Sequence, residues 1–213
     1  MDGTRLQQLV NRGYALSADR IGTPYAFYRP TGPFLPLSNM PYATLPAAFS
    51  PADYKFAKPN TYGKATWQAL FDGAQTQVGD LLVGVSRYFI AAQQPILPIL
   101  VVEAPRLVDV RRPFRQTTVG FSPTYGGTTP AQETPIMTGW PCSIIQGTKG
   151  ENTGSNIPDA NRNPWYNILL PAWPGVTLFT SDFLQDDLGR RYIVSSTELT
   201  DLGWRLTAAA AQA

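Results

Sequence analysis

Short apolar runs, broken by turn residues, recur along two long parts of the chain and predict a mainly β protein. The first part, residues 66–113, includes "GDLLVGVSRYFIAAQQPILPILVVEAPRLVDV", in which Gly, Asp and Pro separate segments rich in aliphatic and aromatic residues. The second part, residues 165–208, contains "WYNILLPAW", "FLQDD", "RRYIVSST" and "GWRLTAAA". This spacing of strands and turns favours a β-sandwich or a β-barrel.

The N-terminal segment has a different period. Within residues 4–21, the side chains of Leu6, Leu9, Val10 and Tyr14 fall near one face of a helix. We therefore expect one amphipathic helix at the start of the chain.

The segment that follows, "GTPYAFYRPTGPFLPLSNMPYATLPAAFSP", is dense in proline and aromatic residues. Proline lacks the N–H group that a helix interior or a central strand needs, so we predict a short strand at Tyr25–Tyr28 and then an extended arm. An irregular arm cannot shelter its own aromatic side chains, which makes them candidate subunit contacts. They are Phe34, Tyr42, Phe49, Tyr54 and Phe56. The predicted division is a helix and arm over residues 1–65 and a β domain over 66–213, with a loop-rich insertion at 114–164 that holds a strand at Thr138–Ile145.

Two stretches of the β domain resemble each other and predict two related hairpin units. They are "GDLLVGVSRYFIAAQQP" from Gly79 and "SDFLQDDLGRRYIVSSTEL" from Ser181, each with a polar entry, a strand, a tight turn and a strand that Arg-Tyr begins. The aligned pairs include Asp80 with Asp182, Tyr88 with Tyr192 and Ile90 with Val194. We expect the hairpins at 80–92 and 182–196 to superpose, with coincidence as the alternative.

The second stretch carries a charged tip, "DDLGRR". Asp187-Leu188-Gly189 has the composition of a turn, and Asp186 is expected to form an exposed pair with Arg190 across it. The prediction is a solvated hairpin tip. The alternative is a docking site for a partner, with these candidate residues: Asp186, Asp187, Arg190 and Arg191.

Composition adds a reason to expect an assembly. Charged residues make up 15% of the chain, the net charge is +2 and there are 20 prolines, against about 25% charged residues in average proteins. A weakly charged surface is expected to be hidden against other subunits. The net charge does not indicate a nucleic acid partner. No apolar run is long enough to span a membrane, and the N-terminus lacks the apolar core of a secretory signal.

Catalytic chemistry has few candidates here. The chain has no histidine and one cysteine, Cys142, which we interpret as a buried apolar side chain that forms no disulfide. The carboxylates considered for a glycosidase pair have no distinctive spacing; they are Asp72, Asp80, Glu103, Glu133 and Glu151. Metal-ligand clusters and phosphate-binding loops are not found, so we predict no metal, no cofactor and no enzymatic activity. The five tryptophans are expected in a core or a subunit interface, with sugar stacking as the alternative.

Several longer stretches resemble a family of tailed-bacteriophage virion proteins. They are "LQQLVNRGYALSADRIGTPYAFYRP", "YFIAAQQPILPILVV", "YGGTTPAQETPIMTGWPCSIIQG" and "LLPAWPGVTLFTSDFLQDDLGRRYIVSSTELTDLGWRLTA". In addition, "DFLQDDLGRRYIV" is similar to a hairpin of the small β-barrel head–tail joining proteins. The resemblance implies a non-enzymatic virion component of the neck or tail, such as a head–tail connector or a tail-fibre attachment ring. Its partners would be copies of itself and other neck or tail proteins. The alternatives are a receptor-binding module for host surface sugar and a cell-wall hydrolase.

Overall fold

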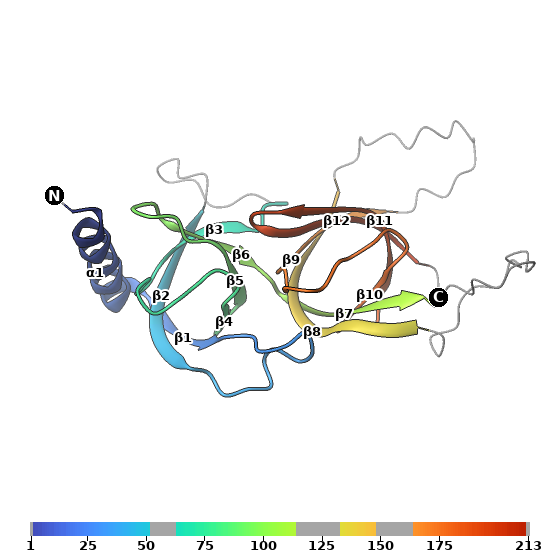
Figure 1. Cartoon of the computed structure of the whole chain (residues 1–213), viewed down its shortest axis with the longest axis horizontal. Coiled ribbons are helices and arrows are strands. Elements are labelled where there is room, and N and C mark those ends of the chain that lie inside the picture. The colour runs from blue at the N-terminus through green and yellow to red at the C-terminus, as the bar shows by residue number, and fades with distance from the viewer. Residues whose placement is uncertain (1, 52–62, 114–132, 148–163, 212–213) are drawn as a thin grey trace, which may run out of the picture.

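The structure is a computed structural model that describes residues 2–51, 63–113, 133–147 and 164–211. It contains one N-terminal helix and two closed antiparallel β-barrels. Helix α1 (Gly3–Ile21), the first barrel and the second barrel follow one another along the longest axis of the molecule (Figure 1). The mainly β fold with an N-terminal helix and two related units is confirmed, and its sheets close into barrels.

The first barrel contains the segment that the sequence predicted as an arm. Its strands are β1 (Thr23–Tyr28), β2 (Ala43–Pro51), β3 (Thr66–Leu70), β4 (Leu81–Val83), β5 (Arg87–Ala92) and β6 (Ile99–Glu103). Their order around the barrel is β1-β2-β3-β6-β5-β4, and pairing of β1 with β4 closes it. The predicted division between residues 65 and 66 is wrong, because it separates β2 from its neighbour β3. Proline is tolerated here because Pro24 and Pro46 are register partners, so their two missing N–H donors fall at one position of the ladder.

The second barrel follows after the two-residue link Ala104–Pro105. Its strands are β7 (Arg106–Pro113), β8 (Glu133–Gln146), β9 (Trp165–Leu170), β10 (Phe183–Asp186), β11 (Arg191–Thr200) and β12 (Gly203–Ala210). The predicted strand at Thr138–Ile145 is confirmed as part of β8. The parts of the predicted loop-rich insertion on either side of this strand, 114–132 and 148–163, lie outside the described residues.

The two barrels share one topology. Read from β7, the order in the second barrel is β7-β8-β9-β12-β11-β10, which repeats the first order strand for strand. The register also breaks at the same place, between Ile90 and Ala92 in one barrel and between Val194 and Ser196 in the other. The predicted hairpins are equivalent, since Tyr88 pairs with Leu82 and Tyr192 with Leu184. The repeat extends beyond the hairpins to the whole barrel, so the chain is an internal duplication.

Each barrel has its own apolar core, and a third cluster joins them. The third cluster includes Leu81, Phe89 and Val102 of the first barrel, and Ile145 and Leu169 of the second pack against it. Burial of these side chains between the barrels fixes one barrel against the other.

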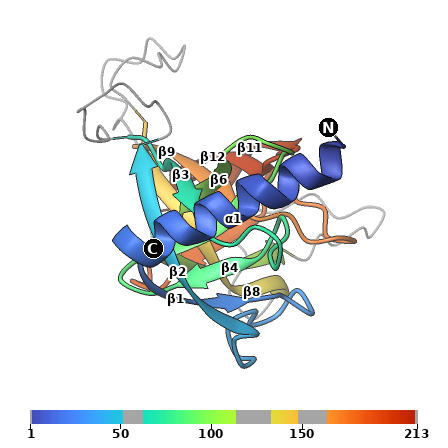
Figure 2. The same ribbon diagram turned by 90° about the vertical axis from the view of Figure 1, so that its left-hand side faces the viewer.

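Helix α1 lies across the outer end of the first barrel, against β2 and β3 (Figure 2). Ala18 is buried on its inner face, and the Gln7 side chain accepts a hydrogen bond from the Ile96 amide. The helix ends where the chain passes close to β2: a Cβ atom at Gly22 would lie 2.8 Å from the Ala47 carbonyl oxygen. The sequence placed Leu9 on the apolar face of the helix, but its side chain is exposed.

The equivalent tyrosines make stability sensitive to alkaline pH. Burial raises the pKa of Tyr88 and that of Tyr192 to about 12 from an ordinary 10.0. Because the folded state holds these protons more tightly, their stabilising effect is complete below about pH 10 and is lost as the pH rises towards about 12. We expect the free energy of unfolding, measured by urea titration, to fall across that window. In Tyr88→Phe the free energy of unfolding should fall less steeply with pH than in the unsubstituted protein. Equal slopes for these two proteins would show that Tyr88 does not contribute to the alkaline loss of stability.

Candidate functional site

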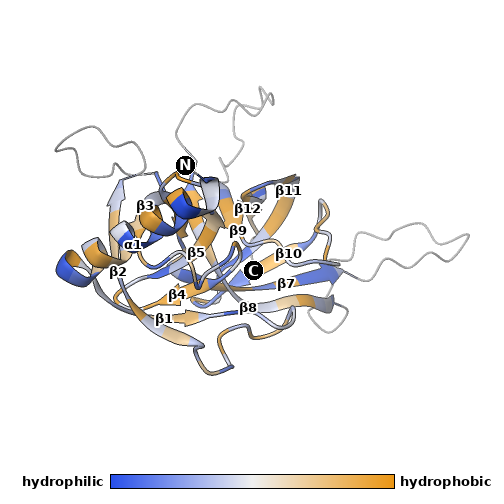
Figure 3. Cartoon of the chain, turned by 60° about the vertical axis from the view of Figure 1, so that its left-hand side comes forward, coloured by the Kyte–Doolittle hydropathy of each residue, from blue (hydrophilic) through white to orange (hydrophobic). Residues whose placement is uncertain are grey.

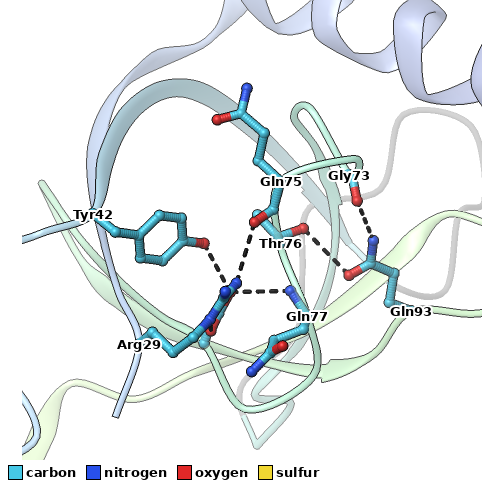
Figure 4. Close-up of polar contacts among 8 residues, drawn as sticks. Arg29, Tyr42, Gly73, Gln75, Thr76, Gln77 and Gln93 are labelled. Atoms are coloured by element: carbon cyan, nitrogen blue, oxygen red, sulfur yellow. Dashed lines mark hydrogen bonds and ion pairs between the residues drawn. The ribbon is translucent and has the colours of Figure 1, made fainter. Parts of the chain in front are cut away.

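A buried carboxylate, Asp80, lies in the turn directly before β4 of the first barrel. Asp80 is 0% exposed and receives two hydrogen bonds from the Arg29 guanidinium, from Nε at 2.9 Å and from Nη2 at 2.8 Å. Its Oδ2 atom also accepts from the Tyr42 hydroxyl at 2.7 Å and from the Gln77 amide at 3.0 Å. Arg29 reaches the Gln75 carbonyl as well (Figure 4). We call Arg29 and Asp80 the first clamp.

The second barrel repeats this arrangement. The Arg112 guanidinium donates to Asp182 through Nε and Nη2, both at 2.9 Å, and Nη2 also donates to the Thr177 carbonyl. The Phe179 amide donates to Oδ2 of Asp182, as the Gln77 amide does to Asp80. We call Arg112 and Asp182 the second clamp. Each clamp ties the end of the first strand of its barrel to the turn that precedes the fourth strand.

An aromatic ring lies against each guanidinium. The Arg29 guanidinium carbon is 4.7 Å from the centroid of Tyr42, and that of Arg112 is 4.5 Å from the centroid of Phe179. The hydrogen bonds that the guanidiniums donate to the aspartates raise the pKa of both arginines. Burial, followed by the bond to Asp80, raises the pKa of Tyr42. These arginines and Tyr42 are protonated at neutral pH, so each guanidinium is a charged partner for its buried carboxylate.

Sequence reasoning aligned Asp80 with Asp182 but did not find their arginine partners. A signal was present, because Arg-Pro occurs at the end of the equivalent strands, at Arg29-Pro30 and at Arg112-Pro113. The turns before the aspartates share a left-handed residue, Gly79 at φ 90 and Ser181 at φ 72.

The other carboxylates considered for catalysis have structural partners. Asp72 accepts from the Ala74 amide, Glu103 from the Trp67 indole, and Glu133 from Arg191. Glu151 lies outside the described residues. In the part of the chain that the structure describes, no group of three or more acidic or cysteine residues could hold a metal ion.

The charged tip is a turn, as predicted, but its four candidate residues do not form one cluster. Asp186 is buried and accepts from the amides of Leu188 and Arg190 and from the Tyr192 hydroxyl. Asp187 pairs with Arg106, and Arg191 pairs with Glu133. The expected exposed pair between Asp186 and Arg190 is wrong, because Asp186 turns inward to bond the backbone of its own turn.

This geometry predicts different sensitivities along the tip. Asp186→Ala should lower the free energy of unfolding by about 1–3 kcal/mol, since it leaves buried donors without an acceptor. Asp186→Asn should cost less, because the Oδ1 atom that accepts hydrogen bonds from both amides is kept.

The other two tip positions are expected to differ from each other. Asp187→Ala, at a half-exposed pair, should cost less than about 1 kcal/mol. Gly189→Val should cost about 1–3 kcal/mol, because Gly189 has φ 77. Chemical denaturation of the four variants checks this order, and equal costs for Asp186→Ala and Asp187→Ala would contradict it.

The five candidate aromatic contacts have different surroundings. Phe49 belongs to β2, is partly buried and stacks on Tyr88 of the first barrel, with ring centroids 4.1 Å apart. Tyr42 donates a hydrogen bond to Asp80 of the first clamp, and both Tyr42 and Phe34 are exposed. Tyr54 and Phe56 lie outside the described residues.

The segment between β1 and β2 crosses to the second barrel of the same chain. The Leu35 amide donates to the Thr138 carbonyl, and the Pro33 carbonyl accepts from the Thr138 amide and from the Trp140 indole. Gly139 permits this approach, because a Cβ atom there would lie 2.9 Å from a Leu35 methyl carbon. This part of the predicted arm thus packs on the second barrel of its own chain and joins the two barrels.

All five tryptophans are described, and none is exposed. Trp140 and Trp204 are buried, and Trp67, Trp165 and Trp173 are half-buried. This agrees with the expected core positions and offers no open platform for stacking a sugar ring. Cys142 is buried as predicted, and burial raises the pKa of its thiol.

Comparison with protein-family models, with curated proteins and with solved structures gives no significant match. Within the described residues, no helix combines the length and the apolar character that spanning a membrane requires.

Proposed function

We propose that the protein is a non-enzymatic structural component of a tailed-phage particle, part of a neck or tail ring built through contacts among many subunits. The observation that carries the proposal is the distribution of apolar side chains on the described surface. Met40 is 90% exposed, Val85 89% and Ile21 70%, and Leu9 and Leu16 are exposed on α1. Figure 3 shows that α1 carries both hydrophobic and hydrophilic stretches.

The exposed apolar residues lie at several separate places, which suits a subunit with several neighbours. Leu9 and Leu16 are two helical turns apart on α1, whereas Met40 lies on the segment that joins the barrels and Val85 at the β4–β5 turn. Contacts at separate places let identical subunits close a ring, and weak contacts add up in such a ring. The clamps and the shared core keep the spacing between these places fixed.

Two other functions remain as alternatives with less support. A receptor-binding module for host sugar would favour exposed tryptophan rings, yet the tryptophans are at least half-buried, and the exposed rings among the described residues are those of Phe34, Tyr42 and Phe179. A cell-wall hydrolase would need two free carboxylates facing a cleft, whereas the described candidates are engaged in capping or pairing.

Replacement of the exposed leucines of α1 tests the proposal. Leu9→Glu/Leu16→Glu should change the melting temperature of the isolated protein little, because both leucines are 52% exposed, but should reduce its incorporation into particles at least tenfold. The control is Gln8→Glu/Arg12→Glu, which alters charge at exposed polar positions of the same helix. Incorporation is measured by quantitative mass spectrometry of purified particles. Normal incorporation of the leucine variant would contradict a contact role for α1.

A further inference from the structure

An open pocket of about 460 Å³ lies beside the second clamp. Its lining combines the clamp residues Arg112 and Asp182 with the apolar side chains of Pro113, Ile136 and Phe179. The hydroxyl-bearing residues Thr134, Thr180 and Ser181 complete the lining. The site is therefore an apolar hollow that contains one buried carboxylate.

The internal duplication shows what fills the corresponding place in the first barrel. Ala43 of β2 pairs with Phe27 of β1, and Met137 of β8 pairs with Val110 of β7. The residues directly before them are Tyr42 and Ile136. The register of the second barrel shifts between Val110 and Arg111, which leaves Ile136 outside the ladder, and its side chain lines the pocket beside Arg112 as the Tyr42 ring lies beside Arg29. In the first barrel Tyr42 places its ring against the guanidinium and its hydroxyl on the carboxylate.

The shorter Ile136 reproduces neither contact. Oδ2 of Asp80 accepts from Arg29, from the Gln77 amide and from the Tyr42 hydroxyl. Among the described residues, Oδ2 of Asp182 accepts only from Arg112 and from the Phe179 amide. In the second barrel Phe179 places its ring against the guanidinium, as Tyr42 does in the first, and the described residues supply no counterpart to the Tyr42 hydroxyl bond.

We propose that this pocket binds the phenol group of a tyrosine side chain presented by another polypeptide. The phenol ring would pack among Ile136, Pro113 and Phe179, and its hydroxyl would donate to Asp182, as Tyr42 donates to Asp80 in the first barrel. The source is a side chain on a polypeptide because that is what fills the equivalent site. This inference concerns only what the pocket accommodates, and it does not depend on the proposed virion role.

Titration of isotope-labelled protein tests it, with p-cresol, toluene, N-acetyl-tyrosinamide and N-acetyl-phenylalaninamide as probes. Both phenolic probes should shift the amide signals of Phe179, Thr180 and Ser181 and should bind at least fivefold more tightly than their counterparts without the hydroxyl. The absence of shifts up to the solubility limit, or equal binding of p-cresol and toluene, would overturn the proposal. Binding of p-cresol without binding of N-acetyl-tyrosinamide would overturn the polypeptide source.

Exchange of Tyr42 and Ile136 provides matched variants. Ile136→Tyr should fill the pocket, weaken p-cresol binding at least tenfold and raise the melting temperature. Tyr42→Ile should open the corresponding pocket in the first barrel, so that p-cresol also shifts the amide signals of Gln75, Gln77 and Gly79. Unchanged p-cresol binding in Ile136→Tyr would place the ligand elsewhere and overturn the assignment.

Discussion

Arg29→Met should lower the free energy of unfolding by about 3–5 kcal/mol, because it leaves the fully buried carboxylate of Asp80 without a countercharge. Arg112→Met should cost at least as much. Its carboxylate, Asp182, keeps the Phe179 amide as donor, whereas Asp80 keeps both the Gln77 amide and the Tyr42 hydroxyl. Chemical denaturation of the two variants measures both losses.

The control for the clamps is Arg205→Met, since Arg205 forms a mostly exposed pair with Glu198. That substitution should change the free energy of unfolding by less than about 1 kcal/mol. Arg29→Met/Asp80→Asn should recover part of the loss, because asparagine still accepts hydrogen bonds but carries no charge. If Arg29→Met were as mild as Arg205→Met, the first clamp would not stabilise the barrel.

Trp140→Ala should also cost about 3–5 kcal/mol, because it removes one of the largest fully buried side chains of the second barrel. Its ring packs near Trp173, and its indole donates to the Pro33 carbonyl at 2.6 Å. The substitution should therefore weaken both the core and the crossing between barrels.

Trp140→Phe separates these two effects, because it keeps most of the apolar volume but loses the hydrogen bond. Hydrogen exchange at the Leu35 and Thr138 amides, which hold the crossing in place, should accelerate in this variant. Exchange at the Gly79 amide, bonded to Ile90 in the first barrel, is the internal reference. Equal protection of Leu35 in both proteins would show that the indole does not hold the crossing.

The sequence predicted those features that depend on neighbouring residues. Local periodicity and turn chemistry predicted a mainly β chain, the N-terminal helix and the equivalence of the hairpins around Tyr88 and Tyr192. The structure contains all three. The turn at Gly189 was predictable for the same reason, since glycine takes up positive φ without strain.

Features that depend on distant residues were missed. The clamps join residues 51 and 70 positions apart, and no local pattern links an arginine at the end of one strand to an aspartate before another. The prolines of β1 and β2 suggested an arm, because a single sequence does not reveal that Pro24 and Pro46 face each other. Asp186 was expected to be exposed because turn composition does not show which way a carboxylate points.

A cryo-electron microscopy reconstruction of purified particles tests the proposed structural role most directly. The account predicts several copies of the tandem barrel in a closed ring at the neck or tail, with the Leu9 and Leu16 face of α1 covered by a neighbouring subunit. Particles that lack the chain would contradict it, as would a position only at a distal fibre tip with that face of α1 uncovered.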